Sequence, residues 1–191
     1  MTQRVFVDAN VLASRTCLDW LFFLRLHNEG MFQLHATNDV FAETIRTLRR
    51  NNPRLPGGVV TDRLEKIREC MDEVLRDFSG EGKFSGKDKD DYHVHAAAVA
   101  SKADLILTNN DPADITQTPD EELYEIINSD EFFMLVTDSN PHCVVPITQE
   151  QFSYWGSKPG SRPLDEALKR ASCPQFAARV RKALQYIAQT S

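Results

Sequence analysis

Short apolar runs along the first two thirds of the chain alternate with longer stretches in which apolar residues recur at helical spacing. Four of these runs predict buried strands, over 4–8, 32–35, 104–108 and 124–127. The spacing between them predicts helices over 17–28, 40–48, 61–78 and 91–102. Strands separated by helices build βαβ units, so we expect a three-layer α/β fold with a mainly parallel central sheet and flanking helices.

The pattern changes after about residue 138. Residues 156–163 are rich in Gly, Ser and Pro, which is typical of a linker. From Leu164 to about Ile187, apolar residues recur at helical spacing and basic side chains outnumber acidic ones. We therefore expect a main domain over 1–137 and a small helical C-terminal extension over 138–191.

Composition and charge exclude several classes of protein. The 191 residues are 41% hydrophobic and 26% charged, which argues against disorder. No stretch approaches the roughly 18 apolar residues of a membrane span, and the first residues lack the apolar core of a secretion signal. Four scattered cysteines form no CxxC pair, which suits a reducing cytoplasm. A net charge of −6 excludes an indiscriminate binder of polyanions but not a nuclease whose metal site is built from its own carboxylates.

Acidic residues gather where the predicted strands end. Asp8 closes the first run, the polar residues 109–111 follow the third, and Asp90 and Asp91 begin the helix that leads into the third. Glu43, early in its own helix, is a further candidate. Because ligands of a parallel sheet bind beyond the carboxyl ends of its strands, we expect a site at this edge.

Carboxylates that converge there would repel one another. Two unit charges about 4 Å apart cost roughly 4 kcal/mol at an effective dielectric constant near 20. A proton or a divalent cation relieves this repulsion, and ligands that are all oxygen favour Mg²⁺ or Mn²⁺ over zinc. Such a cation lowers the pKa of a bound water and clamps a phosphate, which is the chemistry of phosphodiester hydrolysis.

These motifs resemble those of the PIN-domain ribonucleases. Residues 5–12, V-F-V-D-A-N-V-L, are similar to the opening strand and D-x-N motif of the family, and 40–48 resemble the segment with its early acidic helix position. The block 88–110 is similar to the signature D-x-D-D-x-H-V-x-A-A-A…A-D-x-I-x-T-x-N of a bacterial subgroup. Residues 129–133 resemble the closing segment of that subgroup, and the tail around 173–177 resembles the C-terminal extension of some VapC-type toxins.

The resemblance implies roles for individual residues. Asp8, Glu43 and Asp91 would be catalytic carboxylates that bind the metal, and Asn10 and Thr108 would orient Asp8. Asp91 is preferred to its neighbour at position 90 because it stands five residues before an alanine, as in the family.

The chain departs from the family at the fourth acid. Many members carry Asp two residues after the threonine, where this chain has Asn110. Asp111 and Asp114 are nearby candidates for a further metal ligand, so whether one or two ions bind stays open. In this interpretation Asn110 would lie beside the metal ligands.

Each acid also has an ordinary structural explanation. Asp8 would serve equally as a cap of the helix that follows it, and Glu43 as the partner of Arg46 three residues on. Asp90 and Asp91 are typical first-turn acids, favoured by the helix dipole. The combination of these acids with Asp8 is what favours a metal site.

Basic residues and histidines near these acids are less specific. Four arginines lie between Thr44 and Thr61 with no acid among them, and they predict either phosphate contacts beside the site or a solvated helix face: Arg46, Arg49, Arg50 and Arg54. His93 and His95 are two residues apart, so a helix does not bring them to one face and a zinc pair is not expected.

We therefore expect a cytoplasmic endoribonuclease that depends on Mg²⁺ or Mn²⁺ and does not bind membranes. The resemblance alone implies the role of toxin in a type II toxin–antitoxin pair, with a cognate antitoxin protein and, as in many relatives, a homodimer. One alternative is a catalytically impaired PIN-like scaffold, altered at Asn110, that binds RNA or a protein. A haloacid-dehalogenase-type phosphatase would need a second Asp where this chain has Asn10.

Overall fold

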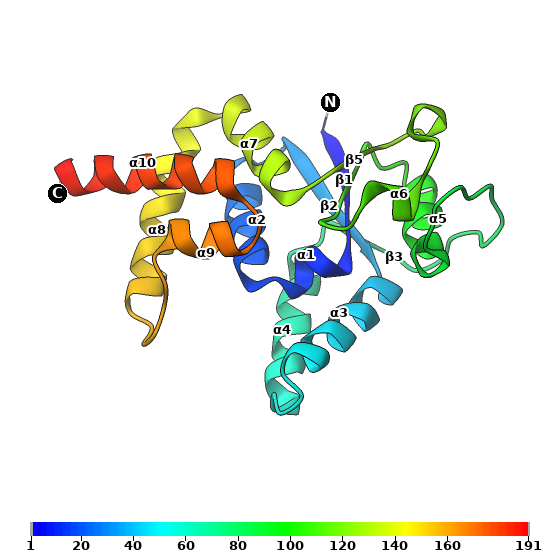
Figure 1. Cartoon of the computed structure of the whole chain (residues 1–191), viewed down its shortest axis with the longest axis horizontal. Coiled ribbons are helices and arrows are strands. Elements are labelled where there is room, and N and C mark those ends of the chain that lie inside the picture. Colours follow the sequence, from blue (N-terminus) through cyan, green and yellow to red (C-terminus); the bar gives the residue numbers. More distant parts are fainter. Residues whose placement is uncertain (1, 191) are drawn as a thin grey trace. The chain divides into compact units, whose positions relative to one another are not determined.

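The computed structural model describes residues 2–190, which pack as two units, each described here on its own (Figure 1). The first unit contains the residues up to 13 together with 30–128, and the second contains 14–29 together with the residues from 129 on. The expected domain boundary at 137/138 stays a prediction. Among the described residues, no helix has both the length and the apolar character needed to cross a bilayer.

A five-stranded parallel sheet forms the centre of the first unit. Its strands are β1 (Gln3–Val7), β2 (Phe32–Thr37), β3 (Glu73–Leu75), β4 (Leu105–Leu107) and β5 (Glu125–Ile127), in the order β3-β2-β1-β4-β5. Val5 pairs with Leu34 on one side and Leu105 on the other, and Val5, Phe6 and Val7 are fully buried. The expected α/β fold with a parallel sheet is confirmed.

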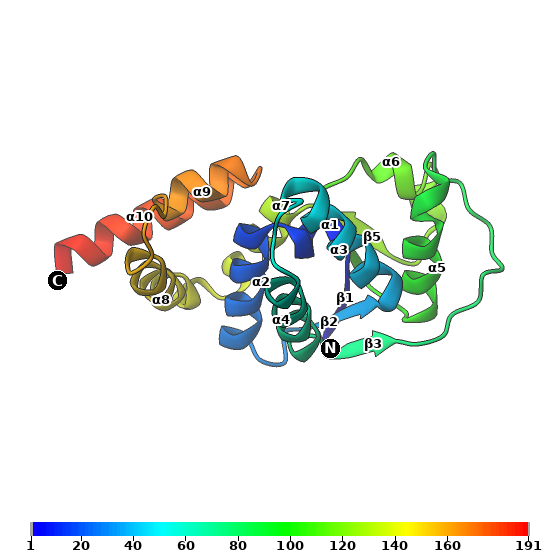
Figure 2. The ribbon, with the colours of Figure 1, turned by 90° about the horizontal axis from the view of Figure 1, so that it is seen from below.

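Helices cover both faces of this sheet. They are α1 (Ala9–Ala13), α3 (Asn38–Asn51), α4 (Gly57–Glu69), α5 (Tyr92–Ala100) and α6 (Pro112–Ile115). Figure 2 shows α3 and α4 on one side of the strands and α5 on the other. From β1 the sheet grows towards β2 and β3, whereas from β4 it grows towards β5, so the direction of winding reverses between β1 and β4. Ligands of doubly wound sheets bind at such a switch point.

The predicted helix over 61–78 is wrong in its second half. The helix α4 ends at Glu69, and the backbone then turns: Asp72 N–H donates to Leu34 O at 2.9 Å, and Leu34 N–H donates to the Asp72 carboxylate at 2.8 Å. These bonds begin the pairing of β3 with β2. A three-residue edge strand is too short to show a two-residue period, so its sequence could not be told from a continuing helix.

Five helices make up the second unit: α2 (Arg15–His27), α7 (Ser129–Ser139), α8 (Val144–Gly156), α9 (Leu164–Arg170) and α10 (Pro174–Thr190). Trp20 and Phe176 meet edge to face with ring centroids 5.0 Å apart, and both are almost fully buried. The Asp130 carboxylate accepts hydrogen bonds from the backbone N–H groups of Gln175 and Phe176, at 3.1 and 2.8 Å, and so caps the start of α10.

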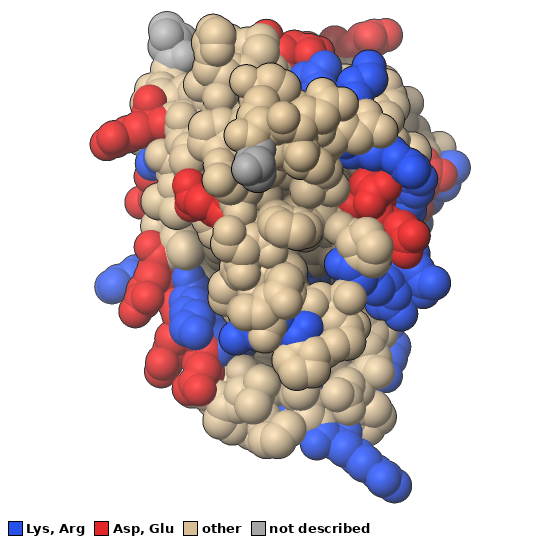
Figure 3. Space-filling model, turned by 90° about the vertical axis from the view of Figure 1, so that its left-hand side faces the viewer, with Lys and Arg blue, Asp and Glu red and all other residues tan. Residues whose placement is uncertain are grey.

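Two details of the C-terminal prediction change. The helix α8 continues to Gly156, so the loop begins at Ser157, and the predicted helical segment from Leu164 is two helices. Ser172 between them has a φ of 63°, a left-handed conformation that ends a helix. Figure 3 looks onto the side that carries these C-terminal helices, where the middle is largely uncharged and most charged side chains lie towards the margins.

Candidate active site

Asp8 is a buried, fully hydrogen-bonded acid at the switch point of the sheet. It follows β1 directly, is 3% exposed, and its backbone N–H donates to Leu107 O of β4 at 3.0 Å. One carboxylate oxygen, Oδ2, accepts from Asn10 Nδ2 at 2.6 Å and from the Thr108 hydroxyl at 2.7 Å. The other, Oδ1, accepts from the Ala9 N–H at 2.6 Å. Three donors from two neighbouring strand ends therefore fix this carboxylate.

Burial raises the pKa of Asp8 above its ordinary value of 3.8. The hydrogen bonds from Thr108 and Ala9 act in the opposite direction, and the charge of Glu43 raises the pKa further. The loop after β4 completes the support: Asn10 Oδ1 accepts from the Asn109 N–H at 2.9 Å, and the Asn110 N–H donates to the Thr108 hydroxyl at 3.1 Å.

Asp91 stands where the chain enters α5, at the end of a short 3₁₀ turn (Lys89–Asp91). Its pKa is raised to about 6, first by burial and then by the negative charges of four other acids: Asp8, Asp88, Glu43 and Asp114. Acids on α3 and α6, one directly after β1 and one in the loop before α5 thus act on one carboxylate. The sequence predicts that Asp8, Glu43 and Asp91 converge, and in the structure the charges of Asp8 and Glu43 act on Asp91.

Glu43 has a partner that the sequence did not indicate. Its Oε1 lies 3.1 Å from Nε2 of His93, which is the second residue of α5. Burial lowers the pKa of His93, but its hydrogen bond to Glu43 and the charges of Glu43, Asp39 and Asp8 outweigh this, so the pKa is raised. The alternative pairing of Glu43 with Arg46 is not among the ion pairs of residues 2–190.

The two candidates for a further acid differ. Asp111 accepts from the Ala113 N–H at 3.0 Å and caps α6, and its side chain is exposed. Asp114 is half-buried and is one of the charges that raise the pKa of Asp91. The geometry therefore brings Asp114, rather than Asp111, to the acidic group.

The backbone of the loop before α5 lies close to the backbone of α6 in this part of the site. Lys87 N–H donates to Ala113 O at 2.9 Å and Asp88 N–H donates to Asp114 O at 3.2 Å, so the loop before α5 lies against α6. A Cβ on Gly86 would come within 2.2 Å of Asp114 O. Only glycine fits here without a shift of the backbone.

The donor set fits a hard divalent cation but is not assembled as a ligand cluster. Within residues 2–190, no three His, Cys, Asp or Glu side chains are grouped closely enough to hold a metal ion as they stand, and Glu43 is hydrogen-bonded to His93. The acids nevertheless offer only oxygen atoms, which Mg²⁺ and Mn²⁺ prefer. The repulsion that raises the pKa of Asp91 is what such a cation relieves.

The predicted basic cluster divides in two. Arg46, Arg50 and Arg54 are exposed. Arg49 is half-buried and donates to Leu55 O, so it ties the end of α3 to the following turn. Glu43, Arg46 and Arg50 are spaced to share one face of α3, which places two arginines along the helix from the acidic site.

The fold and site define a doubly wound α/β protein with several carboxylates at the switch point of its sheet. A family model described as the PIN domain matches residues 4–111, more than half of the chain, and the chain belongs to that family. PIN domains are generally nucleases, hydrolases that commonly use divalent metal ions. Neither the curated proteins nor the solved structures contain a match to this chain.

Proposed function

We propose that this protein is an endoribonuclease that depends on Mg²⁺ or Mn²⁺. The observation that carries the proposal is the Asp8 carboxylate, buried and held by three hydrogen-bond donors at the switch point of the sheet. Acids from separate elements act on the neighbouring Asp91, whose pKa is raised to about 6 first by burial and then by their charges. Membership of the PIN domain family supports nuclease chemistry. The products would carry 5′-phosphate and 3′-hydroxyl ends.

Asp8, Glu43 and Asp91 would hold the ion, with Asp114 the better candidate for a fourth ligand. When bound, the ion would lower the pKa of a water molecule and stabilise charge on the scissile phosphate. Asn10 and Thr108 hold the Asp8 carboxylate in one orientation by donating to its Oδ2.

Other residues would position the substrate. The exposed Arg46, Arg50 and Arg54 would contact phosphates of the RNA strand that runs past the acids. Arg46 and Arg50 lie about 4.5 and 10.5 Å along the axis of α3 from Glu43, at about 1.5 Å per residue. Contacts of this kind bind the backbone and do not select a sequence.

A finer role is also proposed: toxin of a type II toxin–antitoxin pair, cytoplasmic and held inactive by a cognate antitoxin, with a homodimer as in many relatives. Support comes from the resemblance of the block 88–110 and of the tail around 173–177 to VapC-type toxins.

A second candidate function is a PIN-like scaffold with impaired catalysis that binds RNA or protein. Two observations favour it: Asn110 stands where many relatives have an acid, and Glu43 is hydrogen-bonded to His93. This scaffold would bind RNA equally well with and without metal.

Cleavage of end-labelled structured RNA, tRNA included, tests the proposal. The reactions contain Mn²⁺, Mg²⁺ or EDTA and compare wild type with Asp8→Asn and Asp91→Asn. Asp62→Asn, an exposed acid on α4, is the matched control. We expect metal-dependent cleavage that both site variants lose and the control keeps. RNA binding without cleavage, unaffected by metal, would instead establish the scaffold.

A further inference from the structure

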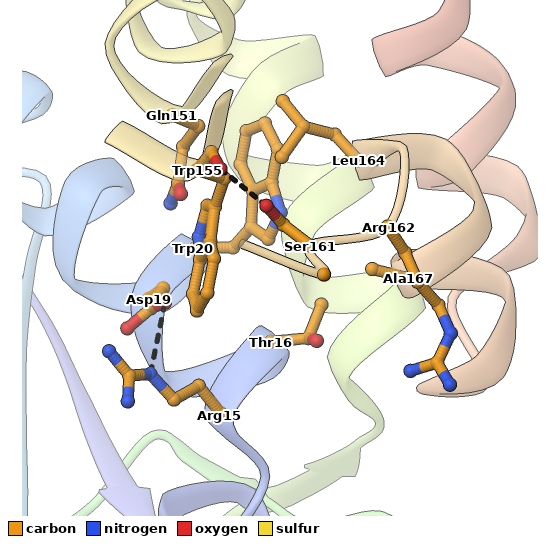
Figure 4. Close-up of a pocket in the computed structure, with 11 residues that line it drawn as sticks. Arg15, Thr16, Asp19, Trp20, Gln151, Trp155, Ser161, Arg162, Leu164 and Ala167 are labelled. Carbon is orange, nitrogen blue, oxygen red and sulfur yellow. Dashed lines mark hydrogen bonds and ion pairs between the residues drawn. The ribbon is translucent and has the colours of Figure 1, made fainter. Parts of the chain in front are cut away.

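The second unit contains a pocket of about 240 Å³ that the proposed chemistry does not use (Figure 4). Arg15 and Asp19 line it from α2, Gln151 and Trp155 from α8, and Arg162 from the loop before α9. Eight of its eleven lining residues carry hydrogen-bonding or charged side chains: Arg15, Thr16, Asp19, Trp20, Gln151, Trp155, Ser161 and Arg162. The exposed surface of the pocket is mainly apolar, with the polar groups set among aromatic and aliphatic side chains, which suits a flat ring that carries polar groups at its edge.

Gln151 is the clearest sign that a ligand belongs here. The side chain is 1% exposed, and among the described residues its Nε2 has no hydrogen-bond partner. Figure 4 shows its amide extending from α8 towards Asp19 and Trp155. A buried N–H group without an acceptor is unfavourable, so a ligand with an acceptor at this point would be stabilised.

Trp155 and Arg15 form a preorganised wall. The Arg15 guanidinium carbon lies 5.0 Å from the centroid of the Trp155 ring, its Nε is 3.8 Å from Asp19 Oδ2, and its NH2 is 3.3 Å from the Tyr154 hydroxyl. These contacts fix the guanidinium beside a large aromatic face.

The loop that closes the pocket is tied to the end of α8. The hydroxyl of Ser161 donates to Trp155 O at 2.5 Å and lies 2.6 Å from Lys158 O, as the dashed line to Trp155 in Figure 4 shows. Arg162, the next residue, is exposed and lines the same pocket. The pocket therefore combines an aromatic wall, a free amide donor, a carboxylate and two guanidinium groups.

We propose that this pocket binds one unpaired nucleobase together with its phosphate. The proposal rests on the proposed function, because the nucleotide would be part of the RNA that the protein holds. The base would stack on Trp155, because every nucleobase has a π face and stacking on an aromatic side chain is tolerant of sequence. The Watson–Crick edge of every nucleobase also carries both an acceptor and a donor, which match the Gln151 amide and the Asp19 carboxylate. Arg15 and Arg162 would contact the phosphate.

Binding of a protein partner explains the pocket less well. An apolar anchor residue would fill the space beside Trp155 but would leave the Gln151 N–H without an acceptor. A nucleotide satisfies this N–H group and matches the two arginines.

Intrinsic fluorescence isolates this pocket, because both tryptophans of the chain, Trp20 and Trp155, line it. The full-length wild-type protein is titrated in EDTA with the four ribonucleoside 5′-monophosphates and with the matching nucleosides. We expect saturable quenching by the monophosphates with a dissociation constant on the order of 1 mM. The nucleosides should bind about threefold more weakly, because they lack the phosphate that the arginines contact.

Matched variants locate the binding. Gln151→Leu should raise the dissociation constant about fivefold, and Gln149→Leu, an exposed position on the same helix, should leave it unchanged. Trp155→Leu should raise it about tenfold, followed through the remaining Trp20. Arg162→Gln should raise it about threefold, whereas Arg170→Gln, exposed on α9 and outside the pocket, should not.

The absence of saturable quenching by any nucleotide would overturn the proposal, as would equal effects of Gln151→Leu and Gln149→Leu. A response to acetyl-phenylalanine amide without any response to nucleotides would replace it with a protein-anchoring pocket. Since the titration needs no metal and no cleavage, its failure is separate from failure of the nuclease assay.

Discussion

The two sides of the acidic site are built differently. On the strand side, Asp8 is buried and held by three donors, so its carboxylate has one orientation. On the helix side, Glu43 is 38% exposed and hydrogen-bonded to His93, and the pKa of Asp91 is raised to about 6 by burial and then by the charges of nearby acids. The comparison indicates that the strand ends hold one acid in a fixed orientation, whereas the helices hold acids that are less firmly placed and whose charge would respond to the cation of the proposed function.

The largest effect on cleavage should come from a change that loosens the Asp8 carboxylate on the strand side. Thr108→Val removes the hydroxyl that donates to Asp8 Oδ2 and accepts from the Asn110 N–H. Because residues that orient a metal ligand typically matter by 10–100-fold, we expect cleavage to fall by about that factor. Thr108→Ser, which keeps the hydroxyl, should restore most of the rate measured with labelled RNA. Equal loss in both variants would show that packing of the methyl group, not the hydrogen bond, is what matters.

Gly86→Ala should disturb the helix side through its backbone. The added Cβ would come within 2.2 Å of Asp114 O, so the loop carrying Asp88 must move away from α6. We expect a loss of about 2 kcal/mol in the free energy of unfolding, measured by urea denaturation, together with weaker Mn²⁺ binding. Gly80→Ala, where a Cβ would meet nothing within 4 Å, is the matched control. Wild-type stability in Gly86→Ala would refute the close approach.

Asp91→Asn should stabilise the metal-free protein while it abolishes cleavage. The pKa of Asp91 is 3.8 in the unfolded chain and about 6 in the folded protein. Above about pH 6 the carboxylate is ionised and destabilises the folded state, whereas below about pH 4 it is protonated in both states and has no such effect. We expect a gain of about 1 kcal/mol at about pH 7.5, reduced from the full value of the shift by solvent screening, and little gain at about pH 4. Denaturation at both pH values measures this. A loss of stability at the higher pH would contradict the repulsion.

The smallest effect should come from releasing Glu43. His93→Phe removes the ring nitrogen that lies 3.1 Å from Glu43 Oε1, so the carboxylate no longer has to leave a partner to reach a cation. We expect the dissociation constant for Mn²⁺ to fall about threefold, which is the scale of one partly exposed ion pair. Isothermal titration calorimetry detects this change, with His142→Phe, exposed in another part of the chain, as the control. Weaker binding in His93→Phe would mean that His93 supports the site instead of competing for Glu43.

Much of this architecture was predictable because it depends on local pattern. The run that ends at Asp8 is buried on both faces, and the parallel sheet follows from strands separated by helices, so the sequence indicated where the acids of the strand ends would lie. The resemblance to the PIN domain family also implied that Asn10 and Thr108 orient Asp8, and both side chains donate hydrogen bonds to its carboxylate.

What escaped prediction depends on contacts between distant segments. The partner of Glu43 lies on another helix, fifty residues on, so the helical spacing of Arg46 gave the wrong candidate. The structure distinguishes Asp111 from Asp114 because Asp111 caps α6 and is exposed, whereas Asp114 is half-buried and its charge acts on Asp91. The pocket around Gln151 and Trp155 draws on α2, α8 and a loop, and none of these segments has a recognisable motif of its own.

A calorimetric titration with Mn²⁺ tests the central claim most directly, that acids from separate elements form one cation site around Asp8. Wild type, Asp8→Asn and the exposed control Asp62→Asn are compared in the same buffer. The account predicts saturable binding by wild type and Asp62→Asn, and a loss of binding in Asp8→Asn although that variant stays folded by circular dichroism. Binding of equal affinity in Asp8→Asn, or none in wild type, would contradict it.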